Sequence, residues 1–253
     1  MRFENYILNE GRSKTITEEQ VIEMLSAYCS KAVKTYASSP IYRGVNNRDD
    51  YLYISPNPLK PRKSANTANF YTLIMNNAPK WKKYPKRQII CSTNSNTTVG
   101  YSIKGNSFQV FPYDGAKIGV CPTDDIWNSF NNNLDDLNMD INTLFEYFNV
   151  YGIDNIKTYK QLINAFKKLT LPKISDDVWS DDLAYQLNDI DPFILKPYNT
   201  LYDWAMEFYD PNKNGFKVVK VGSKLPTGDN EAWLDSKCVM IREKRMGYIM
   251  EKL

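Results

Sequence analysis

The chain has 253 residues, of which 42% are hydrophobic and 24% are charged, and its 32 Lys and Arg against 29 Asp and Glu give a formal net charge of +3. This length and composition predict a globular protein of one or two domains and exclude a disordered or fibrous chain. Because the sequence has no histidine, a Ser-His-Asp or Cys-His catalytic set, a histidine-ligated zinc site and a histidine general base are excluded.

The N-terminal half predicts one helix followed by short strands. Thr15 or Thr17 is a candidate N-cap, because glutamates follow in the opening turn of a periodic apolar segment that continues to about Ala37. Pro40 breaks this pattern. The elements expected after it are a strand at 41–45, a helix at 67–77, a strand at 88–91 and strand segments within 107–120.

The C-terminal half predicts a helical block and then strands. Helical patterns occur near 123–130, 141–148, 158–169, 178–187 and 201–208, and strand patterns return at 216–221, 231–234 and 237–241. We therefore expect an α+β fold in a single domain over 1–253. Its mixed β core follows an N-terminal helix and is interrupted by a helical insertion at approximately 123–210.

The spacing of the cysteines and the hydropathy of the sequence predict the cellular compartment of the protein. The four cysteines have no C-x-x-C spacing and predict buried thiols in a reducing compartment rather than a disulfide framework. The first residues lack the apolar run of a signal peptide, and no stretch approaches the roughly 18 apolar residues of a membrane span. These features predict a cytoplasmic protein without a membrane partner.

Charge is distributed unevenly along the chain. Between Tyr51 and Tyr113 there are basic residues and no acid, whereas 174–195 holds aspartates and no base. The basic residues are Lys60, Arg62, Lys63, Lys80, Lys82, Lys83, Lys86, Arg87 and Lys104. This asymmetry predicts an anionic ligand near the 51–113 segment; ordinary solvated surfaces are the alternative interpretation.

Three short polar motifs accompany predicted strands. Tyr42-Arg43-Gly44 lies on the first strand, Ser92-Thr93-Asn94 ends a later one, and Asp229-Asn230-Glu231 leads into the strand at 231–234. Each motif alone also fits an ordinary role: a strand-end arginine paired with an acid, a polar turn, and a solvated edge-strand glutamate. The 210–215 segment has Asp and Asn at alternate positions with Gly at the sixth, but it lacks the terminal Glu of a calcium loop and predicts a turn.

In this order the three motifs resemble the Arg, Ser-Thr-Ser and Glu-x-Glu motifs of the arginine–serine–glutamate class of mono-ADP-ribosyltransferases. The resemblance covers roughly 40–121 and 216–241 and implies a β core of ADP-ribosyltransferase type. The sequence departs from the family motifs at two positions: Asn94 stands where the family has Ser, and Asp229 stands where the family has Glu or Gln. The Asn-, Tyr- and Lys-rich composition is also similar to that of tailed-bacteriophage proteins, which would place the protein in the host cytoplasm.

The resemblance implies NAD as the bound dinucleotide and assigns a role to each motif. Glu231 would bond to the ribose 2′-OH and stabilise the developing oxocarbenium ion, while Asp229 would help to present the acceptor. Arg43 would bind the pyrophosphate, and Ser92 would hold the rotamer of Glu231. The further NAD-binding residues implied are Gly44, Thr93, Asn94 and Tyr101, with Tyr101 covering the nicotinamide ring.

The leading hypothesis is therefore an NAD-dependent mono-ADP-ribosyltransferase, phage- or toxin-like, that modifies a host protein or nucleic acid. Two alternatives remain open. One is a non-enzymatic nucleic-acid-binding or virion-associated protein, in which Tyr71, Trp81, Tyr84 and Tyr101 stack on bases between the basic residues of 51–113. The other is an NAD glycohydrolase, in which water is the acceptor.

Overall fold

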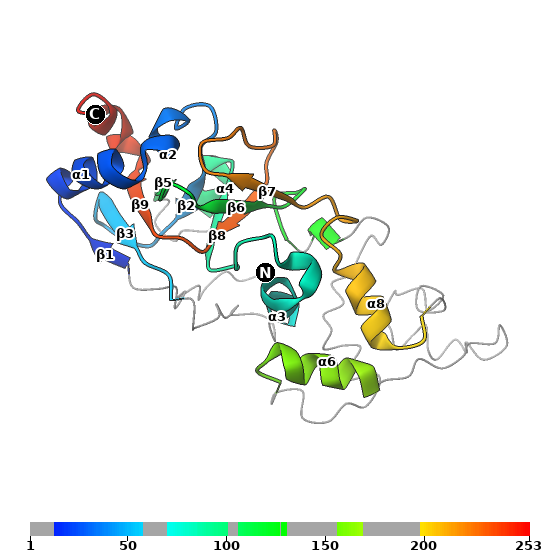
Figure 1. Cartoon of the computed structure of the whole chain (residues 1–253). Coiled ribbons are helices and arrows are strands. Elements are labelled where there is room, and N and C mark those ends of the chain that lie inside the picture. Colours follow the sequence, from blue (N-terminus) through cyan, green and yellow to red (C-terminus); the bar gives the residue numbers. More distant parts are fainter. Residues whose placement is uncertain (1–12, 58–69, 101–105, 127, 131–155, 169–197) are drawn as a thin grey trace. The chain divides into compact units, whose positions relative to one another are not determined.

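The computed structural model describes residues 13–57, 70–100, 106–126, 128–130, 156–168 and 198–253 (Figure 1). The chain divides into two compact units. The first comprises residues 1–65, 83–126 and 215–253, and the second comprises 66–82 and 127–214. The second unit overlaps the predicted helical insertion and also takes in the segment around residue 70.

A large antiparallel sheet forms the first unit. Its strands are β1 (Ser13–Thr15), β2 (Tyr42–Gly44), β3 (Tyr51–Ile54), β4 (Ile89–Ser92), β5 (Ser107–Pro112), β6 (Lys117–Val120), β7 (Lys217–Lys220), β8 (Glu231–Leu234) and β9 (Cys238–Arg242). They lie in the order β1-β3-β9-β5-β2-β4-β8-β6-β7. Every neighbouring pair among these strands is antiparallel, so the expected mixed core is corrected to an antiparallel one.

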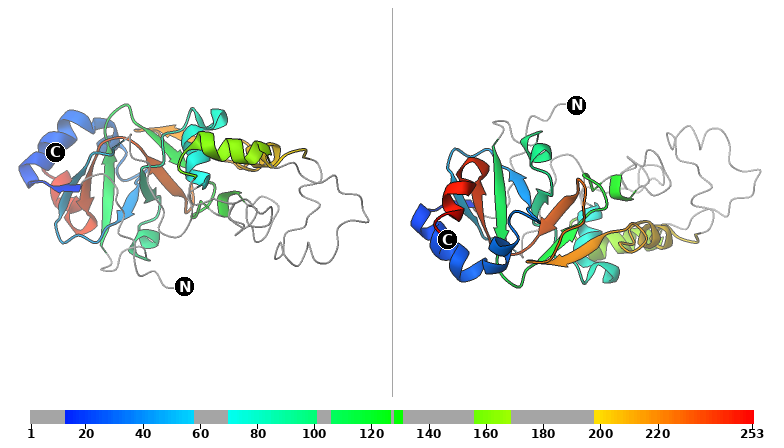
Figure 2. Two further views of the ribbon diagram at one scale, coloured as in Figure 1. Left: turned by 90° about the horizontal axis from the view of Figure 1, so that it is seen from below. Right: turned by 90° about the horizontal axis from the view of Figure 1, so that it is seen from above.

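Helices pack on this sheet near the N- and C-terminal ends of the described chain. Helix α1 (Glu18–Tyr28) begins at Thr17, whose side chain forms a capping box with Gln20, and α2 (Ser30–Lys34) follows it directly. The predicted single helix is thus two helices joined at Cys29. The C-terminal η5 (Glu243–Arg245) and α9 (Met246–Met250) lie beside α1 and α2 in both views of Figure 2. Val21, Leu25 and Ile249 are fully buried and join the apolar core of the sheet.

The second unit is helical in its described parts. It contains α3 (Phe70–Asn77), η1 (Pro79–Trp81), η2 (Asn128–Phe130), α6 (Tyr159–Lys168) and α8 (Leu201–Phe208). Thr200 caps α8 by a second capping box, with Asp203. The helices predicted at 158–169 and 201–208 are confirmed, whereas those predicted at 141–148 and 178–187 lie outside the described residues.

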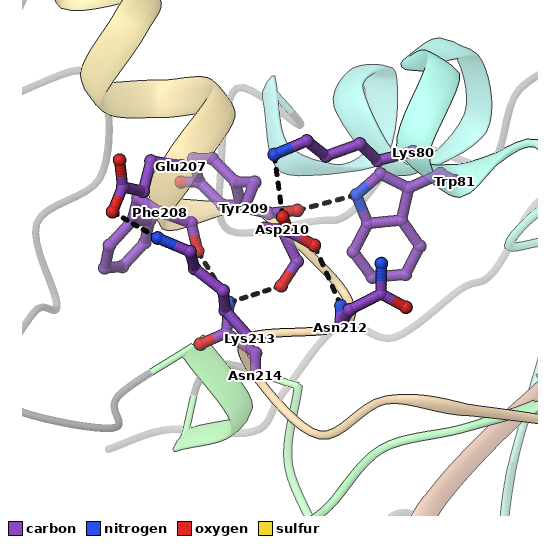
Figure 3. A network of polar contacts seen from close by, with 9 residues as sticks. All are labelled: Lys80, Trp81, Glu207, Phe208, Tyr209, Asp210, Asn212, Lys213 and Asn214. Carbon is purple, nitrogen blue, oxygen red and sulfur yellow. Dashed lines mark hydrogen bonds and ion pairs between the residues drawn. The ribbon is translucent and has the colours of Figure 1, made fainter.

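Polar contacts join η1 to the segment that follows α8 (Figure 3). The Trp81 indole Nε1 donates to the Tyr209 carbonyl at 2.8 Å, and Lys80 Nζ lies 2.7 Å from Asp210 Oδ2. The other Asp210 oxygen accepts the Asn212 N–H at 2.9 Å. Burial opposes ionisation of Asp210, but the hydrogen bonds from Lys80 and the backbone hold the pKa of its carboxyl below the usual value.

Hydrogen bonds of the same network also define the conformation of the 210–215 segment. Asn214 donates to the Phe208 and Asp210 carbonyls at 2.7 and 2.9 Å, and Gly215 has a φ of +74°. The segment is a turn closed by its own side chains, as its sequence predicted.

Candidate functional site

The three sequence motifs lie on three adjacent strands, β2, β4 and β8. Tyr42 is paired with Ser92 across β2 and β4, and Ser92 is paired with Glu231 across β4 and β8. These three residues form one row across the sheet, although 50 and 139 positions separate them along the chain, as their numbers show. Residues directly opposite one another in antiparallel strands project from the same face. The sheet therefore brings Ser92 and Glu231 together at one end of β4.

The carboxylate of Glu231 is held at both oxygens. Its Oε1 lies 2.5 Å from Arg87 Nη2, and its Oε2 accepts the backbone N–H of Ile126 at 3.3 Å. The side chains of Arg87 and Glu231 are 4% and 12% exposed. A hydrogen bond from a charged donor in such a sheltered position is shorter and stronger than a neutral one. Glu231 is thus a fixed carboxylate that retains lone pairs for a further donor.

Ser92 differs from its expected role. Its Oγ accepts the backbone N–H of Asn94 at 3.0 Å, and among the described residues no side-chain hydrogen bond joins Ser92 to Glu231. The Asn94 Oδ1 in turn accepts the N–H of Asn96 at 2.9 Å, at the start of α4 (Ser95–Gly100). Asn94 therefore serves as the N-cap of that helix, which is a position that favours Asn as much as Ser. This capping role is a local structural reason for Asn94 at the position where the resembled ADP-ribosyltransferase motif has Ser.

The second and third motifs are joined by a compact set of hydrogen bonds. Thr93 N donates to the Asn230 carbonyl at 3.0 Å, and Asn230 N donates to Thr93 Oγ1 at 2.9 Å. The same hydroxyl donates to the Gly228 carbonyl at 2.8 Å, and Asn230 Nδ2 donates to the Cys121 carbonyl at 3.0 Å. Thr93 is therefore a structural link between strand ends. Between these anchored residues, Asp229 is exposed.

Arg43 is buried, with 7% of its surface exposed, and Gly44 ends β2 beside it. The described ladder between β2 and β4 has the single pair Tyr42–Ser92, and the Arg43 guanidinium donates to the Ile90 carbonyl beyond it. Arg43 thus bonds a β4 carbonyl at the point where the two strands separate. This contact lies inside the sheet, so Arg43 is less accessible than a pyrophosphate-binding arginine was expected to be.

Tyr42, at the other end of the row from Glu231, is a protonated phenol. Burial raises the pKa of Tyr42, and the nearby Glu243 carboxylate raises it further, so Tyr42 remains a neutral phenol next to Ser92. Tyr101, expected over the nicotinamide ring, lies outside the described residues, as do Lys60, Arg62, Lys63 and Lys104.

The 51–113 segment contributes less surface charge and fewer stacking faces than its sequence predicted. Arg87 is buried against Glu231 and is not a steering charge. The aromatic residues expected to stack on bases are buried: Tyr71, Trp81 and Tyr84 are 4%, 2% and 7% exposed. Their rings therefore serve the apolar cores. The exposed cations in the described part of this segment are Lys80, Lys82, Lys83 and Lys86.

The described residues contain no cluster of three or more Cys, Asp or Glu side chains arranged to hold a metal ion. In the same residues, no helix has the length and apolar composition needed to cross a bilayer. No protein-family model, curated protein or solved structure matches this chain.

Proposed function

We propose that the protein transfers ADP-ribose from NAD to a macromolecular acceptor, with Glu231 as the catalytic carboxylate. The observation that supports this most directly is the row Tyr42–Ser92–Glu231, which joins three motifs distant in sequence on adjacent strands. A second is the fixed Glu231 carboxylate, with one oxygen on Arg87 and the other on a backbone N–H. An ordinary solvated edge-strand glutamate would have neither feature.

The chemistry needs a carboxylate of this kind. The bond between ribose C1′ and the nicotinamide nitrogen breaks, and its electron pair leaves with nicotinamide, which becomes neutral. The ribose is left with oxocarbenium character, which a nearby carboxylate stabilises most effectively where water is scarce. C1′ then bonds to the acceptor nucleophile, which loses a proton.

The remaining motif residues are given roles that agree with their contacts. Asp229 is exposed and lies two positions before Glu231 in the sequence, so we give it the role of presenting the acceptor, whereas Thr93 and Asn230 link the chain segments that carry the two carboxylates. Arg43 donates to the Ile90 carbonyl at the point where β2 and β4 separate. Its contribution to pyrophosphate binding would follow from its position at that separation.

The decisive experiment is nicotinamide release from NAD by the purified protein, with and without a bacterial lysate. Glu231→Gln preserves the size of the side chain and removes its charge, so we expect at least about a 100-fold loss of rate. Glu18→Gln is the matched control, because Glu18 is also ion-paired, with Lys252, but lies on α1. Release that needs lysate supports a transferase, and equal release without lysate identifies a glycohydrolase. Wild-type protein that releases no nicotinamide in either condition contradicts the proposal.

A further inference from the structure

The Arg87–Glu231 ion pair is the most sheltered one in the described chain, and the proposed reaction gives Arg87 no role of its own. Its two side chains are 4% and 12% exposed, against 13% and 20% for Arg242 and Asp50. A sheltered arginine and glutamate lose hydration and are tolerated only when they are paired. Such a pair contributes little to stability compared with apolar side chains of the same volume. The presence of this pair therefore calls for an explanation other than stability.

The hydrogen bonds of the Glu231 carboxylate supply this explanation. A glutamate side chain has three rotatable bonds, and a free carboxylate would sample several positions. Arg87 holds Oε1 and the Ile126 N–H holds Oε2, so the plane and position of the carboxylate are fixed before any ligand binds. Ser92 Oγ, the group expected to do this, is instead engaged by the Asn94 N–H.

We infer that Arg87 is the positioning residue of this site: its guanidinium fixes the Glu231 carboxylate in its reactive orientation. The inference rests on the proposed function. Preorganised groups held by a second layer of contacts account for much of enzymatic rate enhancement, and a displacement of about 1 Å costs on the order of 100-fold in rate. Arg87 need not touch the nucleotide, so its loss should lower kcat and leave the KM for NAD nearly unchanged.

The test measures kcat and KM for nicotinamide release by Arg87→Met, Arg87→Lys and the control Arg242→Met, with melting temperatures for all three. Arg242→Met is the control because it also removes an arginine from a partly buried ion pair of the same sheet. The carboxylate that loses its partner in this variant is Asp50 and not Glu231. For Arg87→Met we expect kcat to fall on the order of 100-fold, with KM within about threefold of wild type. Arg242→Met should lower the melting temperature and keep wild-type kcat.

Arg87→Lys keeps the test decisive if Arg87→Met does not fold. Lysine retains the positive charge but is a flexible point charge, so kcat should fall about tenfold at unchanged KM. A wild-type kcat in Arg87→Lys, or equal changes in kcat and KM in both Arg87 variants, overturns the positioning role. If Glu231→Gln is inactive while the Arg87 variants are fully active, this inference fails and the proposed function stands. If the wild-type protein does not cleave NAD, both fail.

Discussion

Gly119 of β6 is paired with Trp233 of β8, and its Cα faces the Trp233 indole. Trp233 follows Glu231 by two positions on the same strand. A Cβ added to Gly119 would lie no more than 2.7 Å from the Trp233 ring atoms Cε2, Cζ2 and Cδ2. The ring cannot move aside easily, because it is fully buried and its Nε1 donates to the Pro85 carbonyl at 2.9 Å. Tyr84 and Phe216 pack against it with centroid distances of 6.2 and 6.1 Å.

We therefore predict that Gly119→Ala is strongly destabilising. Forcing a methyl group into a packed core costs about 1–3 kcal/mol, and loss of the indole hydrogen bond adds about 1 kcal/mol. The expected decrease in the free energy of unfolding is about 2–4 kcal/mol. Urea unfolding followed by circular dichroism measures it. Because β8 carries Glu231, nicotinamide release should fall as well.

Two further variants make this result interpretable. Gly247→Ala is the control, because Gly247 is in α9 and a Cβ there meets nothing within 4 Å. It should be neutral or stabilising by about 0.5–1 kcal/mol. In a Trp233→Leu background the additional cost of Gly119→Ala should fall below about 1 kcal/mol. A Gly119→Ala single variant within about 0.5 kcal/mol of wild type would refute the close approach.

Two other predictions concern the second unit and the pH dependence of stability. Lys80→Met should lower the free energy of unfolding in urea by about 1 kcal/mol, because it leaves the buried Asp210 carboxylate without its cation. Lys213→Met removes an exposed ion pair with Glu207 and should cost measurably less, and equal losses for the two variants would contradict this account. Burial, assisted by the Asp114 charge, raises the pKa of Cys29 to about 12 from its usual 9.0. The folded state therefore keeps a proton that the unfolded chain releases, so the stabilising contribution of Cys29 is complete below pH 9 and is lost between about pH 9 and 12, by up to about 1.4 kcal/mol per pH unit. Urea unfolding of Cys29→Ala across this window should show a shallower decline than wild type, and parallel curves would refute it.

Local sequence signals predicted the elements that carry the motifs. The strand expected at 231–234 is β8, and the helix expected at 201–208 is α8, because alternating or periodic apolar residues mark both. The strand β1 was missed because Ser13–Thr15 is short, polar and exposed. The helix α4 was missed because its sequence, Ser-Asn-Thr-Thr-Val-Gly, is a poor helix former, and its helical start depends on the Asn94 cap.

The sequence predicted that two of the motifs lie together, but not which contacts their side chains make. Ser92 and Glu231 were expected together, and β4–β8 pairing places them opposite one another. The partner of Glu231 was not foreseen, because Arg87 lies 144 positions away and appeared as one of many cations in a basic segment. Burial distinguishes Arg87 from the neighbouring Lys86, and burial at that position depends on tertiary packing that no local pattern encodes.

The order of the strands in the sheet also governs when the site can exist during synthesis. Strand β8 lies between β4 and β6, and β9 lies between β3 and β5, yet both are made after every other strand of the described sheet. A nascent chain that has emerged as far as β7 therefore has two gaps in its sheet and no Glu231. Arg87 is made 144 positions before its carboxylate partner, so the ion pair and the completed sheet form only after β8 and β9 have been made, and a nascent chain that ends at β7 carries none of the proposed activity.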